Sequence, residues 1–248
     1  MYFIGIDLAW SYKNSSGMAI IKGSEKQSQI LLAKTIFSDN EIISTIKQKV
    51  GEKPALVAID APLIVRNKTG TRPAEKMLNT LFRKYNACAY PVNKKILNKT
   101  GSRGEKISRL LQNLGFEHNP HIKRFERKRK FFEVFSHSSM IVLFRLKSVL
   151  KYKPKCKRSY ETRWKEFEKY QRYLEALRNS KPPLILPKSV TKVKVWGMKG
   201  KKLKNYENIL DAILCAYTAY YCWHHPERCA IFGNPEEGCI LSPVISNK

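Results

Sequence analysis

The stretch that decides the fold is YFIGIDLA, residues 2–9, near the start of the chain. It is short, apolar and bounded by polar residues, which is typical of a buried β-strand. Two further apolar stretches follow at hairpin spacing, GMAIIK at residues 17–22 and ILLAKTIF at residues 30–37, with a Lys-Gly-Ser-Glu turn between them. These three stretches predict an antiparallel meander at the start of the chain.

Beyond the meander, the pattern predicts strands separated by helices. PALVAI at residues 54–59 and FFEVF at residues 131–135 are short apolar runs and are expected to be buried strands. Strands separated by helices are typical of parallel crossover connections within one sheet. We therefore expect a mixed α/β sheet with helices on its faces. The expected helices span residues 39–50, 73–85, 102–114, 138–146, 161–178 and 205–224.

Three segments show no clear periodic pattern. Residues 87–101 are expected to be irregular, and residues 190–196 to be extended. Residues 229–248 contain Gly and Pro and are expected to form a short tail of turns.

Composition excludes several classes of protein. Hydrophobic residues make up 43% of the 248 residues, which argues against a disordered chain. The longest apolar stretches fall far short of the roughly 20 residues that a membrane-spanning helix needs. The N-terminus lacks the basic region and cleavage site of a signal peptide. The six Cys are scattered, so we expect mostly buried thiols and a cytoplasmic protein.

The positive charge is concentrated in the middle of the chain. The formal net charge is +27, and residues 94–204 alone carry 32 basic and 8 acidic residues, a net +24. Aromatic residues are interleaved with the basic ones, which favours nucleic acid, DNA or RNA, over an acidic membrane surface, an acidic protein or a basic surface without a ligand. The candidate nucleic-acid contacts lie in the densest basic run: Lys123, Arg124, Arg127, Lys128, Arg129 and Lys130.

Several acidic residues interrupt apolar segments. Asp7 lies in the first strand, Asp60 ends the strand LVAI, Glu133 lies in FFEVF, and Asp211 interrupts the apolar helix ILDAILCA. A buried carboxylate without a partner costs several kcal/mol, so each is expected to be neutralised, paired or bound to a metal. Glu207 lies four residues before Asp211, so on a helix the two side chains face the same way.

Each acid also has a simple structural explanation. Asp7 and Asp60 could cap neighbouring turns, Asp211 could face solvent, Glu133 could pair with a Lys or Arg, and Glu207 could be an exposed first-turn residue. However, one sheet can bring these separate elements together. A carboxylate cluster in a basic chain indicates Mg²⁺ or Mn²⁺ beside a phosphodiester, because these ions prefer oxygen ligands.

In order along the chain, GIDLAWSYKNSSG, AIDAPL, FFEVF and ENILDAILCAYTAY resemble a family of predicted RNase H-like nucleases catalogued as a domain of unknown function. The resemblance implies an RNase H-like fold with a five-stranded mixed sheet in the order 3-2-1-4-5. It also implies functional acids at Asp7, Asp60 and Asp211, with Glu133 matching the acid of the family's Glu-Val segment. The sequence departs from the family after that segment, where Ser136 and His137 replace the Pro of many members.

The sequence is therefore expected to form a single RNase H-like domain, residues 1–248, with a basic and largely helical insertion at about 147–204. The predicted function is a metal-dependent nuclease in which Asp7, Asp60 and Asp211 hold Mg²⁺ or Mn²⁺. Glu133 is expected as a fourth ligand or a water-positioning group, and Glu207 as a spare ligand. The alternative is a nucleic-acid-binding module without turnover. Actin-like kinases and ATPases are disfavoured because neither a second copy of the fold nor a Gly-rich phosphate loop is visible.

Overall fold

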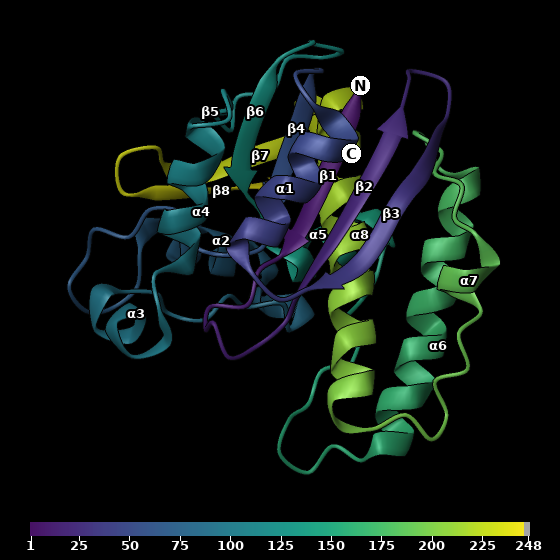
Figure 1. The fold of residues 1–248 in the computed structure, drawn as a ribbon. Helices are drawn as coiled ribbons and strands as arrows, with labels where there is room; N and C mark the ends of the chain where they lie inside the picture. Colours follow the sequence, from purple (N-terminus) through teal and green to yellow (C-terminus); the bar gives the residue numbers. More distant parts are fainter. Residues whose placement is uncertain (246–248) are drawn as a thin grey trace.

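The opening residues form the predicted antiparallel meander in the computed structural model, which describes residues 1–245 (Figure 1). β1 (Tyr2–Asp7) pairs with β2 (Ser16–Gly23), and β2 pairs with β3 (Ser28–Ile36), both antiparallel. The later strands add to the other side of β1 in parallel, as predicted from the helices between them. They are β4 (Ala55–Ile59) beside β1 and β6 (Arg129–Glu133) beside β4.

The sheet has six strands, so the prediction of five strands was wrong. The sixth is β5 (Glu117–His118), a two-residue strand that pairs in parallel with β6 at the sheet edge. The order is β3-β2-β1-β4-β6-β5. A two-residue strand is too short to show any periodicity, so only its pairing with β6 reveals it.

Helices cover both faces of this sheet (Figure 1). On one face, α1 and α4 pack on residues such as Ile4 and Ile6. On the other face, α8 crosses the sheet and packs on residues such as Phe3 and Phe132, together with α2 and α5. The helices are α1 (Asp39–Val50), α2 (Pro73–Phe82), α3 (Lys94–Thr100), α4 (Arg103–Gln112), α5 (Ser136–Leu143), α6 (Tyr160–Ala176), α7 (Lys188–Thr191) and α8 (Gly200–His224). Three short 3₁₀ turns, η1 (Arg83–Tyr85), η2 (Leu177–Asn179) and η3 (Pro226–Arg228), complete the described elements.

Three segments differ from the sequence-based expectation. The region 87–101 contains α3, whose start is stabilised by Asn93, because the side-chain oxygen of Asn93 accepts a hydrogen bond from the Ile96 amide at 3.0 Å. Residues 188–191 form α7, which includes the first two residues of the segment expected to be extended, 190–196. The tail forms an antiparallel hairpin of β7 (Cys229–Asn234) and β8 (Gly238–Pro243), which packs against α2.

The basic segment 147–204 contains α6 and α7, and α6 lies beside the first half of α8 (Figure 1). Tyr170 on α6 donates a hydrogen bond to the Leu210 carbonyl on α8 at 3.2 Å. Gln171 donates to the Tyr206 hydroxyl at 2.7 Å. The aromatic residues of α6 that face α8 are therefore core residues rather than a free surface.

α8 approaches the sheet unusually closely because two glycines lie beneath it. A Cβ on Gly5 would lie 2.0 Å from the Ala212 carbonyl oxygen, and one on Gly17 would lie 1.9 Å from the Asn208 carbonyl oxygen. Any side chain at these positions would push α8 away from β1 and β2. No helix within residues 1–245 is long and apolar enough to cross a membrane.

Candidate active site

The pairing of β1 with β4 places two of the predicted acids side by side. Gly5 lies opposite Ala58 and Ile6 opposite Ile59 in the parallel ladder, so Asp7 and Asp60 follow at the same edge of the sheet. Alternation along β1 puts Asp7 on the same face as Gly5, which is the face that α8 covers. The Asp60 amide also donates to the Ile6 carbonyl at 2.9 Å, which extends the ladder to this residue.

α8 supplies two more acids to the same region. Asp211 follows Leu210 in the part of α8 that packs on Gly5, and Glu207 lies one turn earlier on the same face. Both side chains are fully buried. The close approach of α8 to β1 therefore carries Asp211 into the neighbourhood of Asp7.

The ammonium of Lys153 lies among these carboxylates. Lys153 belongs to the loop between α5 and α6, and its Nζ lies 2.9 Å from Oδ2 of Asp211. Although burial opposes a charged lysine, the carboxylates of Asp211, Asp7, Asp60 and Glu207 raise the pKa of Lys153 above its ordinary value. The four acids of the cluster are thus neighbours of one positive charge. We call Asp7, Asp60, Glu207 and Asp211 the carboxylate cluster.

Asp211 is the most firmly held acid of the cluster. Its Oδ1 accepts hydrogen bonds from the hydroxyls of Tyr152 at 2.7 Å and Tyr170 at 3.1 Å. Burial favours the neutral acid, but Lys153 and these hydrogen bonds prevail and lower the pKa of Asp211. Asp211 is therefore ionised, and only Oδ2 faces Lys153.

Asp7 and Asp60 differ from Asp211, because their pKa values are raised rather than lowered. Burial, followed by repulsion from Asp211, raises the pKa of Asp7 to about 8. Burial also raises the pKa of Asp60, although Lys153 and a 3.3 Å hydrogen bond from the Ser136 amide partly offset it. With a pKa of about 8, Asp7 holds a proton at neutral pH despite the nearby ammonium groups of Lys153 and Lys204, and an additional cation would favour its ionised form.

Glu207 lies next to two basic side chains, Lys204 and Arg163. Its Oε1 accepts a hydrogen bond from Lys204, and the guanidinium of Arg163 lies 3.6 Å from Oε2. Oε2 makes no hydrogen bond. Burial raises the pKa of Glu207, while Lys204 opposes the shift.

His137 lies near the cluster at the start of α5. Burial and the charge of Lys153 lower the pKa of His137 to about 3, so its imidazole is neutral at physiological pH. Its Nε2 has no hydrogen-bond partner. A neutral imidazole there can donate or accept one further hydrogen bond.

Glu133 is not part of the cluster. It ends β6 opposite Ile59, and its carboxylate is directed to Arg72, just before α2, although Glu133 and Asp60 line one pocket. Its carboxylate is held by Arg72, which is 1% exposed, and by the Leu63 amide at 3.0 Å. Arg72 also binds Glu75. Glu133 is thus paired with an arginine, the simpler of the two explanations that the sequence allowed.

The carboxylates do not form a preassembled metal cage. Within residues 1–245, no group of three or more His, Cys, Asp and Glu side chains is arranged so that it could hold a metal ion. The donor chemistry nevertheless suits a hard divalent cation, because every cluster member offers carboxylate oxygen and Oε2 of Glu207 lacks a hydrogen-bond partner. An ion would therefore have to take the place of the Lys153 ammonium.

The predicted nucleic-acid run lies at the opposite end of β6. Arg129 starts this strand and Glu133 ends it, about 13 Å away at 3.3 Å per residue. Arg129 donates to the carbonyls of Gly51 and Leu114, and Lys130 is buried and paired with Glu126 at 2.9 Å. The exposed members of the run are Lys123, Arg124, Arg127 and Lys128.

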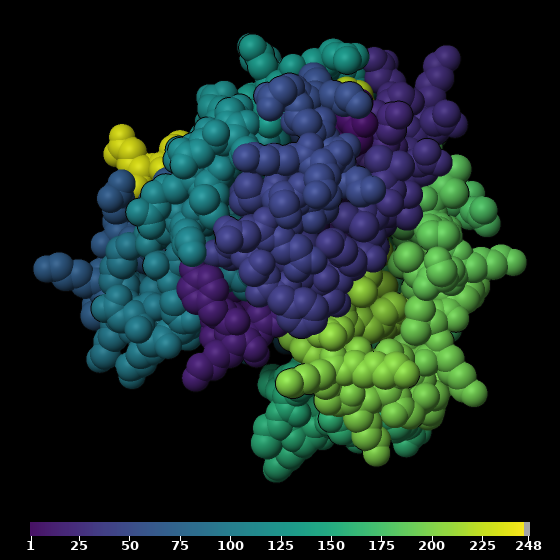
Figure 2. All heavy atoms as spheres, in the orientation of Figure 1, coloured from purple at the N-terminus to yellow at the C-terminus, as the bar shows by residue number. Residues whose placement is uncertain are grey.

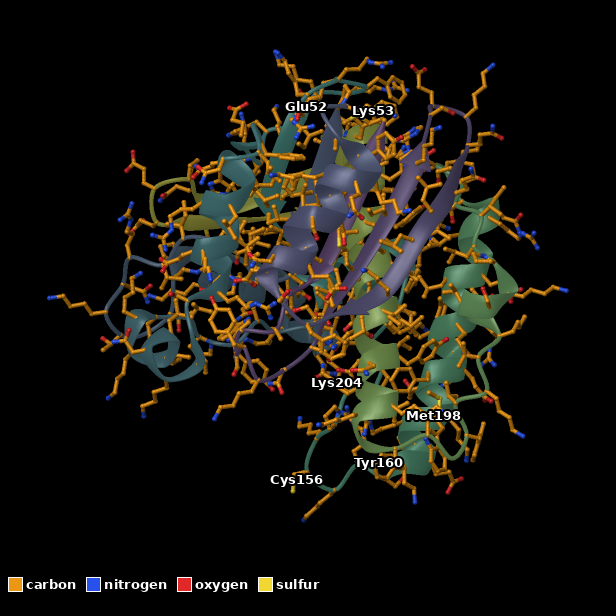
Figure 3. The ribbon with its side chains drawn as sticks, viewed as in Figure 1. Glu52, Lys53, Cys156, Tyr160, Met198 and Lys204 are labelled. Atoms are coloured by element: carbon orange, nitrogen blue, oxygen red, sulfur yellow. The ribbon has the colours of Figure 1, made fainter. Side chains whose placement is uncertain are left out.

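Different basic residues lie beside the cluster. Figure 3 shows Lys204 on the first turns of α8, with Glu52 and Lys53 at the far end of the sheet. Lys153 and Lys204 both belong to the basic segment 147–204, and Arg163 of α6 approaches Glu207. The part of the positive charge that meets the carboxylates therefore comes from this basic segment.

Two pockets flank the cluster and share Trp10. The first, of about 290 Å³, lies where the β1–β2 loop meets the start of α8, which are the purple and yellow-green surfaces at the lower centre of Figure 2. We call it the polar pocket; it is lined by Asp7, Leu8, Ala9, Trp10, Ser11, Asn14, Ser15, Thr100, Lys204 and Asn208. The second, of about 90 Å³, contains Asp60 and three aromatic side chains, Trp10, Tyr90 and Phe135. We call it the aromatic pocket.

Sequence reasoning missed Lys153, Tyr152 and Arg72. Lys153 and Tyr152 lie in KYKPKCK, one of several basic runs, and nothing local distinguishes them from their neighbours. Arg72 precedes the Pro of α2 and carries no motif. Each of them contacts a carboxylate at least 58 residues away in the sequence, Asp211 or Glu133. The sequence signal that could have found them is the general one that a buried acid needs a partner.

Comparison with known proteins assigns the chain to a family. A family model described as "Protein of unknown function (DUF429)" matches residues 5–237, which include every residue of the carboxylate cluster. No curated protein matches the chain significantly. Because the family model spans nearly the entire sequence, the chain belongs to the DUF429 family of proteins of unknown function.

Proposed function

We propose that the protein is a metal-dependent nuclease with an RNase H-like fold. The observation that carries this proposal is the convergence of Asp7, Asp60, Asp211 and Glu207 around the Lys153 ammonium, at the edge of the sheet where β1 and β4 end. Acids from two adjacent strands and one helix, set in a chain of net charge +27, suit a site that handles a phosphodiester.

Asp7, Asp60 and Asp211 would hold Mg²⁺ or Mn²⁺, with Glu207 as a spare ligand. A divalent cation bound there supplies a Lewis acid that activates water and stabilises the leaving oxygen. Glu133 is not proposed as a ligand, because Arg72 and the Leu63 amide already hold its carboxylate.

Neighbouring residues keep the acids in place. The hydroxyls of Tyr152 and Tyr170 occupy Oδ1 of Asp211, which leaves Oδ2 as the only ligand atom on that side chain. The Ser136 amide orients Asp60. The exposed ammonium of Lys204 lines the polar pocket, where it can bind a backbone phosphate of the nucleic acid.

The test is cleavage of labelled single-stranded, duplex and hybrid substrates with Mg²⁺, Mn²⁺ or EDTA. We expect metal-dependent cleavage that Asp7→Asn and Asp211→Asn abolish, while nucleic-acid binding is retained. Glu52→Gln is the matched control, since Glu52 is an exposed acid at the far end of the sheet (Figure 3). Normal cleavage by Asp7→Asn would refute the site assignment.

A second candidate is a nucleic-acid clamp without turnover. It is favoured by one observation, that the Lys153 ammonium already lies among the carboxylates and no metal cage is preassembled within residues 1–245. A clamp would bind nucleic acid with a steep salt dependence and equal affinity in EDTA and Mg²⁺, and neither the parent protein nor Asp7→Asn would cleave.

A further inference from the structure

The aromatic pocket opens beside Asp60 and has an unusual exposed tyrosine at its mouth. Tyr90 is 83% exposed, more than any other large hydrophobic side chain of residues 1–245. Trp10 and Phe135, both half-buried, line the same pocket, and Pro62 and Val92 add apolar surface. Leaving a tyrosine in water costs hydrophobic free energy, so a flat apolar ligand that covers it would be favoured.

The floor of this pocket contains an unsatisfied buried acceptor. Glu75 lines the pocket and is 1% exposed, and its Oε1 is bound by Arg72, yet its Oε2 has no hydrogen-bond partner. A buried carboxylate oxygen without a partner is costly, and a ligand with an N–H group could satisfy it. Apolar aromatic walls around one strong acceptor match a planar heterocycle that carries an amino group.

We propose that the aromatic pocket binds one unpaired nucleobase, with Trp10, Tyr90 and Phe135 as stacking surfaces and Oε2 of Glu75 as acceptor of the base's amino group. This inference rests on the proposed function in one respect, that the occupant is part of a nucleic acid. The pocket shares Asp60 with the carboxylate cluster, so the base would be next to the phosphodiester held there.

The surroundings favour a nucleic acid over an aromatic peptide. Exposed basic side chains follow the lining residues along the chain, Arg66 and Lys68 after Pro62 and Lys95 of α3 after Val92, and they can neutralise phosphates on either side of the base. The polar pocket continues from Trp10 on the other side of Asp7, with Lys204 at its edge. A single strand could therefore pass from the polar pocket, across Asp7 and Asp60, to the aromatic pocket.

Two properties of the substrate follow. A base inside a duplex cannot enter a pocket between aromatic side chains, so the substrate is single-stranded there or the base is flipped out. Cytosine, adenine and guanine carry exocyclic amino groups that a carboxylate accepts. Thymine and uracil present two carbonyl oxygens beside their only N–H, which repel a carboxylate, so they bind less well.

The experiment measures binding of fluorescent oligonucleotides by anisotropy in EDTA, where no cleavage occurs. We compare oligo(dC), oligo(dA), oligo(dT) and a duplex for the parent protein, Tyr90→Ala and Phe37→Ala. Phe37 is the matched control, because it is an aromatic residue that is 66% exposed and lies outside both pockets. Tyr90 is exposed, so its removal does not threaten folding.

We expect tighter binding of oligo(dC) and oligo(dA) than of oligo(dT). Tyr90→Ala should weaken binding of the single strands by about tenfold, the size of one lost stacking contact, and leave duplex binding unchanged. Phe37→Ala should bind like the parent. Glu75→Gln, which replaces the free acceptor by a donor while keeping an oxygen for Arg72, should reduce or reverse the preference over oligo(dT).

Equal binding of all single strands by the parent and Tyr90→Ala would overturn the inference, as would the absence of single-strand binding. The outcome is separable from that of the nuclease proposal. Loss of binding in Tyr90→Ala without any cleavage by the parent would retain the base pocket and refute the nuclease. Cleavage by the parent, together with unchanged binding by Tyr90→Ala, would support the nuclease and refute the base pocket.

Discussion

The ammonium of Lys153 lies 2.9 Å from Oδ2 of Asp211, and it is the positive charge that Asp7, Asp60 and Glu207 also share. A lysine in this position does what a bound cation would do, because it neutralises buried carboxylates. It would also compete with such a cation for the same oxygens. Removing the lysine therefore separates these two effects.

Lys153→Met should have opposite effects on stability and on metal affinity. Without divalent ions, the free energy of unfolding should fall by about 2 kcal/mol, less than for a fully buried pair because Lys153 is 30% exposed. The affinity for Mn²⁺ should rise by about tenfold, because an ion no longer displaces an ammonium. Calorimetric titration with Mn²⁺ and denaturant unfolding in EDTA measure the two effects.

The matched control for this experiment is Lys155→Met. Lys155 is exposed in the same loop, so its removal changes the net charge equally without touching the cluster. If Lys153→Met and Lys155→Met bound Mn²⁺ with the same affinity, Lys153 would not compete with the metal.

The raised pKa of Asp7 predicts how stability depends on pH. In the folded protein this pKa is about 8, against an ordinary value of 3.8, so between about pH 4 and pH 8 the folded chain holds a proton that the unfolded chain has released. The contribution of Asp7 to the free energy of unfolding therefore decreases as pH rises through this window and is constant above it.

The measurement compares the parent protein with Asp7→Asn, because other groups titrate in the same range. Denaturant unfolding in EDTA, from about pH 5 to about pH 8, should show the parent losing stability relative to the variant as pH rises. Parallel stability curves for the two proteins would contradict a raised pKa at Asp7.

Arg72 is predicted to stabilise the folded protein and to take no part in catalysis. Arg72→Met would leave the buried carboxylates of Glu133 and Glu75 without a cation, so the free energy of unfolding should fall by about 3–5 kcal/mol. Arg66→Met, at an exposed position in the preceding loop, should have little effect. Denaturant unfolding measures both variants.

The pairing of Glu133 with Arg72 predicts that Asp60 and Glu133, both of which were proposed from the sequence as metal ligands, respond differently to substitution. Asp60→Asn should weaken Mn²⁺ binding, whereas Glu133→Gln should leave it unchanged, because Glu133 faces Arg72 and not the cluster. Equal losses of Mn²⁺ affinity in the two variants would show that Glu133 is a metal ligand after all.

Gly5 is predicted to control both stability and the geometry of the site. In Gly5→Ala the new Cβ would lie 2.0 Å from the Ala212 carbonyl oxygen, so α8 must move away from β1 and carry Asp211 with it. We expect a loss of about 3 kcal/mol or more of unfolding free energy, together with weaker Mn²⁺ binding.

Gly70→Ala separates this packing effect from backbone strain. Gly70 has a φ of +77°, and a Cβ at this position would meet no atom within 4 Å, so its replacement should cost only about 1 kcal/mol. Equal destabilisation by the two substitutions would show that α8 is not limited by contact with Gly5.

The sequence determined the elements and their order. The short apolar run YFIGIDLA and the stretches after it predicted the meander, and the helices between PALVAI and FFEVF predicted parallel pairing. Asp7 and Asp60 at strand ends and Asp211 on the last helix were expected to lie close together, and in the structure they lie around Lys153. The sequence could predict this because the face that a residue takes on a strand or helix is a local property of the chain. β5 and the β7–β8 hairpin were missed because their pairing depends on distant partners.

The tertiary structure decided what surrounds each acid. Asp60 and Glu133 look alike in sequence and line one pocket, yet Glu133 is paired with Arg72 while Asp60 lies near Lys153. Lys153, Tyr152 and Tyr90 come from loops whose conformation depends on contacts with remote segments. Local periodicity specifies which face a side chain takes, but the charge of a buried carboxylate depends on partners far away in the chain, and these are known only once the chain has folded.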